Sequence, residues 1–109
     1  MARKISFGKS VKVTAAAALT KDTFAEVDGF FGLVLNSAAA GEEAVLDIEQ
    51  AEYETNQVGT GTAFAVGDKV YFNVASGLFT TTNTDRMVGI ATQASDANGV
   101  FSFILAPQV

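Results

Sequence analysis

Apolar side chains that alternate with a period of two, between short turn signals, constrain the fold of this 109-residue chain more than any other feature. In the last such segment, Phe101, Phe103 and Leu105 fall on one face of an extended chain. This is the period of a β-strand, whose successive side chains point to opposite faces of a sheet. Ten glycines and many threonines fit the same interpretation. The sequence therefore predicts strands and turns rather than helices.

The spacing of these segments predicts three antiparallel hairpins. They cover residues 23–35, 69–82 and 87–105. The first contains Asp28-Gly29 and the third an Asn-Gly pair. Such dipeptides favour tight hairpin turns because their backbones tolerate positive φ angles.

The pattern is less regular in three other stretches. Residues 43–54 change phase at Gln50, which we interpret as a β-bulge or a bend. Residues 55–62 carry little pattern, and the alanines 15–18 are interpreted as a link or a short strand.

Length and composition limit the size of the fold. A chain with 49% hydrophobic and 17% charged residues can bury one core but is too short for two. We expect an all-β fold, a compact antiparallel β-sandwich or barrel with an extended N-terminal arm. The arm is assigned to residues 1–13 and a single β-domain to residues 14–109.

The residue types that are missing exclude several classes of function. The chain contains neither histidine nor cysteine, so Ser-His and Cys-His catalysis and histidine or thiolate metal centres are excluded. We predict that the protein is not an enzyme and has no catalytic, cofactor-binding or metal-binding residues. No apolar run approaches the roughly 20 residues that span a bilayer, so no membrane partner is expected.

One short motif is similar to the end of a phosphate-binding loop. Gly8-Lys9-Ser10 supplies the last three positions, but Arg3 stands where the first glycine is required. No apolar strand precedes the motif and no amphipathic helix follows it. We interpret the segment as a solvated arm or an edge strand.

Six acids form the other cluster: Glu42, Glu43, Asp47, Glu49, Glu52 and Glu54. Paired carboxylates can act as acid and base or bind calcium. In an alternating strand, however, Asp47 and Glu49 point away from the apolar face, and the segment lacks the glycine and asparagine of a calcium loop. The pattern favours a charged outer face, and a carbohydrate- or calcium-binding β-domain is the less favoured alternative.

The N-terminal segment and the rest of the chain carry charges of opposite sign. Residues 1–21 carry five cations and no acid, whereas residues 22–109 carry two cations and twelve acids, a net charge of −10. An acidic body repels phosphate, so we expect an anionic protein surface rather than nucleic acid as the partner of the basic segment. This segment also alternates apolar and basic residues, and could add as a strand to a neighbouring sheet. The candidate interface residues are Arg3, Lys4, Ile5, Phe7, Lys9 and Lys12.

Several segments taken together resemble one known family. They are residues 28–34, 38–43, 66–72, 80–82 and 88–91. Their order and spacing, from about Val11 to Leu105, are similar to those of small phage capsid decoration, or cement, proteins. This family was formerly a domain of unknown function and was sometimes labelled recombinase-like, a label that the incomplete phosphate-binding motif does not support.

The resemblance implies a structural protein located on the capsid surface of a virion. It implies binding to the outer face of an assembled shell, bridging of neighbouring major capsid subunits, and self-association, often as a homotrimer. It also implies a β-sandwich or barrel without a cofactor. The alternative is another virion module, such as a tail or fibre base, which would share the same composition.

Calcium and simple sugars are expected to leave the unfolding temperature unchanged. A specific ligand at 100 times its dissociation constant stabilises a protein by about 2.7 kcal/mol, which a thermal-unfolding screen detects readily. A reproducible, saturable rise with any of these ligands would favour the ligand-binding alternative instead.

Overall fold

The computed structural model describes residues 2–3 and 8–108, and it is built from short strands. Of the predicted interface residues, Lys4, Ile5 and Phe7 lie outside the described residues. The strands are β1 (Ser10–Thr14), β2 (Phe24–Val27), β3 (Phe30–Val34), β4 (Glu43–Asp47), β5 (Glu52–Thr55), β6 (Lys69–Asn73), β7 (Leu78–Thr80), β8 (Arg86–Gln93) and β9 (Phe101–Leu105).

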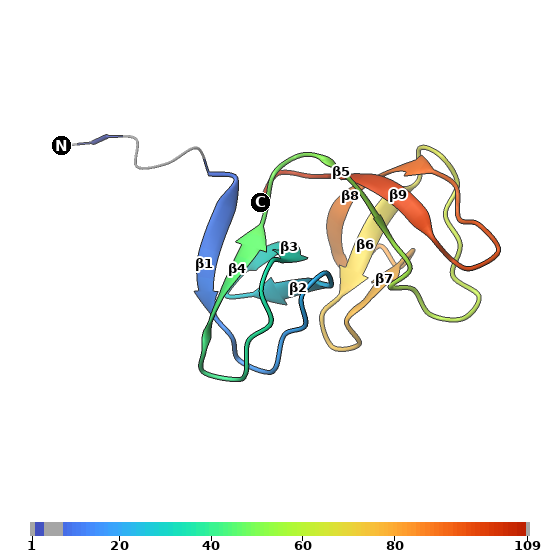
Figure 1. The fold of residues 1–109 in the computed structure, drawn as a ribbon. Coiled ribbons are helices and arrows are strands. Elements are labelled where there is room, and N and C mark those ends of the chain that lie inside the picture. Colours follow the sequence, from blue (N-terminus) through green and yellow to red (C-terminus); the bar gives the residue numbers. More distant parts are fainter. Residues whose placement is uncertain (1, 4–7, 109) are drawn as a thin grey trace.

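These strands form two antiparallel sheets, seen as two neighbouring lobes in Figure 1. The first sheet has the order β1-β4-β3-β2 and the second the order β5-β9-β8-β6-β7. The two sheets confirm the predicted all-β sandwich. In Figure 1, β2 and β3 lie on the side of the first sheet that faces the second.

All three predicted hairpins are confirmed. They are the antiparallel pairs β2–β3, β6–β7 and β8–β9. At the β2–β3 turn, Asp28 and Gly29 have φ angles of 53° and 85°. Both central residues are left-handed, as a two-residue type I′ turn requires.

Of the two interpretations of the phase change at Gln50, the bend is confirmed and the β-bulge is wrong. Strand β4 belongs to the first sheet and β5 to the second. The Ile48 amide still donates to the Lys9 carbonyl at 3.0 Å, whereas the Ala51 carbonyl accepts from the Leu105 amide at 3.1 Å. The phase change therefore marks the crossover between two sheets.

An aromatic core joins the two sheets. From the first sheet, the stacked rings of Phe24 and Phe31 lie 5.5 Å apart. They pack among rings of the second sheet, such as Phe79, whose centroid is 5.4 Å from that of Phe24 and 5.8 Å from that of Phe31. A second cluster lies on the other face of the first sheet, and its buried members are Val13, Ala15, Val27, Val34, Ala38, Ala44 and Leu46.

Two glutamine side chains hold the β2–β3 hairpin from opposite edges. The Gln57 amide accepts a hydrogen bond from Phe24 N at 2.8 Å and donates to Phe24 O at 3.0 Å and to Gly77 O at 3.0 Å. The Gln108 amide forms the same pair with Phe31, both bonds at 2.8 Å. Each amide thus takes the place of a neighbouring strand.

A partly buried ion pair stabilises the same contact between the β2–β3 hairpin and the second sheet. Arg86, at the start of β8, donates through Nη1 to the Glu26 carboxylate at 2.7 Å and to the Gly29 carbonyl at 2.8 Å. Its Nη2 lies 3.4 Å from Gln108 Oε1. A β8 side chain therefore binds both the hairpin and the glutamine that caps it.

Replacing either glutamine by alanine, Gln57→Ala or Gln108→Ala, is expected to lower the free energy of unfolding by about 1–3 kcal/mol, because partly buried backbone groups of Phe24 or Phe31 lose their partners. Urea unfolding would measure the change. Gln50→Ala is the matched control, since this exposed side chain should contribute less than about 0.5 kcal/mol. Equal effects of all three variants would contradict the assigned role of the amides.

Candidate functional site

The described residues of the predicted interface gather at and before β1. Lys9 immediately precedes the strand and Lys12 lies at its centre, and both side chains are exposed. Arg3 is also exposed. The sequence thus predicted a basic segment, and the structure incorporates its last part into a sheet.

Strand β1 is an edge strand, and its open side can be assigned from its pairing with β4. The Lys9 carbonyl and the Ala15 amide both bond toward β4, at 3.0 and 2.8 Å. Backbone groups alternate in direction along an antiparallel strand. Those of Ser10, Lys12 and Thr14 therefore point away from β4, and the sheet has no further strand among the described residues.

The side chains of β1 divide into a packing face and a polar face. Val11 and Val13 pack in the core cluster of the first sheet, which holds the strand in place. Lys9 Nζ lies 3.5 Å from the Glu49 carboxylate, whereas Lys12 takes part in neither of the ion pairs found between described residues. The open edge therefore has an unpaired cation at its centre.

The acidic cluster of residues 42–54 is largely occupied with local contacts. The Glu42 carboxylate accepts from the Ala39 amide at 2.7 Å, and Asp47 accepts from the Glu49 amide at 3.0 Å. Burial, together with the Asp47 and Glu49 charges, raises the pKa of Tyr53, whose hydroxyl donates to the Glu49 carbonyl at 3.0 Å. Over residues 2–3 and 8–108, no group of three acids is placed to hold a metal ion.

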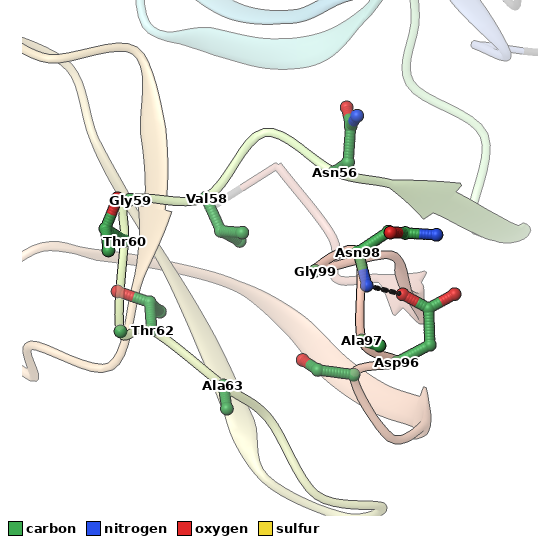
Figure 2. A pocket seen from close by; sticks show the side chains of 12 residues that line it. Asn56, Val58, Gly59, Thr60, Thr62, Ala63, Asp96, Ala97, Asn98 and Gly99 are labelled. Carbon is green, nitrogen blue, oxygen red and sulfur yellow. Dashed lines mark hydrogen bonds between the residues drawn. The ribbon is translucent and has the colours of Figure 1, made fainter.

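A hollow of about 380 Å³ lies between the β5–β6 connection and the β8–β9 turn. Figure 2 shows small and polar side chains around it, including Thr60, Thr62 and Asn98. Its acid, Asp96, accepts from the backbone amides of Asn98 and Val100 at 2.8 and 3.0 Å. This carboxylate therefore shapes its own turn, and no second acid or base among the described residues lines the hollow.

The phosphate-binding interpretation of Gly8-Lys9-Ser10 also finds no support in the fold. Ser10 begins a β-strand, so the segment does not lead into the helix N-terminus that phosphate loops use. Nor do the described residues include any helix long and apolar enough to cross a membrane.

Sequence reasoning named Lys12 but not Ser10 or Thr14 as part of the binding edge. Their contribution is through backbone groups, whose direction depends on the register with β4. No pattern of side chains reveals that register. The open edge could be located only from the fold.

Comparison with known proteins gives the family of the chain. Residues 5–107 match the family described as phage cement protein, and no curated protein matches. The match extends the resemblance seen in the sequence into the N-terminal segment. The chain therefore belongs to the phage cement protein family, whose members are structural components of the virion capsid.

Proposed function

We propose that this cement protein binds the outer surface of an assembled shell as a homotrimer and bridges neighbouring major capsid subunits. The observation that carries the proposal is the open edge of β1, which directly follows the basic N-terminal segment. An edge strand presents a row of unpaired donors and acceptors to any extended segment beside it.

The chemistry of this edge favours an acidic partner. Two copies of β1 that paired centre to centre would bring two Lys12 side chains together, which disfavours self-pairing. An extended capsid segment with an acid opposite Lys12 would gain both the backbone hydrogen bonds and a cross-strand ion pair. The other exposed cations before the strand, Arg3 and Lys9, add to the attraction.

Trimerisation would make such small contacts sufficient. A stable specific interface buries about 800 Å² per partner, which is difficult for an 11.3 kDa chain that uses one strand. Three linked copies convert the later contacts into intramolecular ones and raise the avidity by roughly 10² to 10⁴ over a single site. A trimer that contacts several capsid subunits therefore bridges them.

The variant Lys12→Pro tests strand addition at this edge. Its amide points away from β4, so proline removes an outward donor without removing a β1–β4 hydrogen bond. Binding to empty shells, measured by co-sedimentation, is expected to fall at least tenfold while thermal unfolding changes little. Undiminished occupancy of the shell would refute the proposed edge.

Two control variants separate charge from backbone pairing. Lys12→Ala removes only the charge and should weaken binding less than Lys12→Pro. Lys21→Ala removes an exposed cation from the turn before β2, away from the edge, and should bind like the unmodified protein. Labelled protein found on tails rather than shells by electron microscopy would favour the alternative virion module.

A further inference from the structure

A second surface lies on the outer face of the five-stranded sheet. Met87, Ile90 and Ile104 expose 43%, 36% and 44% of their surfaces there, although most large apolar side chains of the sheet are buried. Ile90 and Ile104 are direct cross-strand neighbours, and Tyr71 lies opposite Met87. These four residues form an apolar patch, which the described residues leave uncovered.

Backbone irregularities in β8 create this patch. The register with β6 shifts by one residue, so that Val70 lies opposite Gly89 and Tyr71 opposite Met87. Val88 is the extra residue in β8, and both Val88 and Ala91 are buried with 2% exposure. Met87 and Ile90 are therefore directed outward although they are three residues apart.

Charges of opposite sign bound the apolar patch. Across neighbouring strands, Glu52 of β5 lies opposite Ile104. On the other side, Lys69 of β6 lies opposite Ile90. The row across the face therefore reads acid, apolar, apolar, base. Lys69 makes no ion pair with any described residue, and the Glu52 carboxylate accepts only a hydroxyl hydrogen bond, from Thr92 Oγ1 at 2.5 Å.

Such a row is complementary to itself under a two-fold rotation. An axis that lies in the plane of the contact, parallel to the strands and midway between Ile90 and Ile104, turns a second copy face to face with the first and exchanges the two ends of the row. Strands in a sheet are evenly spaced at about 4.8 Å. Glu52 of one copy therefore lies opposite Lys69 of the other. Two copies related by this axis would bury isoleucine against isoleucine and form two ion pairs between copies.

We infer that the partner of this face is the same face of a second copy of the protein. A contact of this kind is isologous, whereas the contacts within a trimer are not. It therefore goes beyond the proposed trimer and would join copies that belong to different trimers. A capsid segment and the N-terminal segment are the competing occupants, but neither requires an acid and a base at equal distances from the patch centre.

Exchange of the two charges tests the inference. In the two-fold contact, Glu52→Lys brings lysine against lysine twice, and Lys69→Glu brings glutamate against glutamate twice. Each single variant is expected to weaken self-association at least tenfold, and the double variant to restore it. Sedimentation equilibrium over a range of concentrations would show whether the smallest assembly, monomer or trimer, doubles its mass.

The control is Glu43→Lys, which makes the same charge change on β4 of the other sheet and should leave the doubling intact. Circular dichroism and thermal unfolding confirm that the variants fold. The inference is overturned if the unmodified protein shows no doubling at millimolar concentration, or if the double variant is as weak as the single ones. The doubling of mass is measured relative to the smallest assembly in solution. Its absence would therefore overturn this inference without affecting the separate test of binding to shells.

Discussion

The insertion of the β2–β3 hairpin into the aromatic core of the second sheet is the interaction on which the rest of the structure depends. Phe24 and Phe31 lie on one face of a short hairpin, and without them the two sheets would share few buried side chains. A two-stranded hairpin is marginal in water, so its free edges need partners. Gln57 and Gln108 supply them with side-chain amides instead of strands. Because each amide bonds both the N–H and the carbonyl of a single hairpin residue, the hairpin is fixed at one register relative to the second sheet.

This arrangement leaves distinct surfaces for binding. The inner face of the second sheet is filled by phenylalanines, and the edge of β2 is capped by Gln57. The edge of β1 and the outer face around Ile90 and Ile104 remain available. They belong to different sheets and differ in kind, since the first offers backbone groups and the second offers apolar side chains between opposite charges.

Local sequence signals predicted the hairpins, whereas features that depend on contacts between distant residues could not be predicted from the sequence. Asp28-Gly29 determines its turn through its own backbone preferences, so that the β2–β3 hairpin was predictable. The change of phase at Gln50 looks the same for a bulge and for a crossover, because pairing with β9 or β1 leaves no mark on residues 43–54. The amide contacts of Gln57 and Gln108 span 33 and 77 residues and carry no local pattern. The basic segment was visible as charge, whereas the open side of β1 and the outward direction of Ile90 depend on register.

The two proposed contacts would transmit force across the contact between the two sheets. If β1 binds the shell and the outer face of the second sheet binds another copy, a force between the two partners passes through the β2–β3 hairpin as well as through the chain at residues 48–51, which links β4 to β5. Packing of Phe24 and Phe31 resists separation only through buried apolar area, which is not directional. The amide pairs of Gln57 and Gln108 and the Arg86–Glu26 ion pair are directional, and they resist sliding of one sheet along the other. Such a force meets both kinds of resistance at one place, because both act on the β2–β3 hairpin.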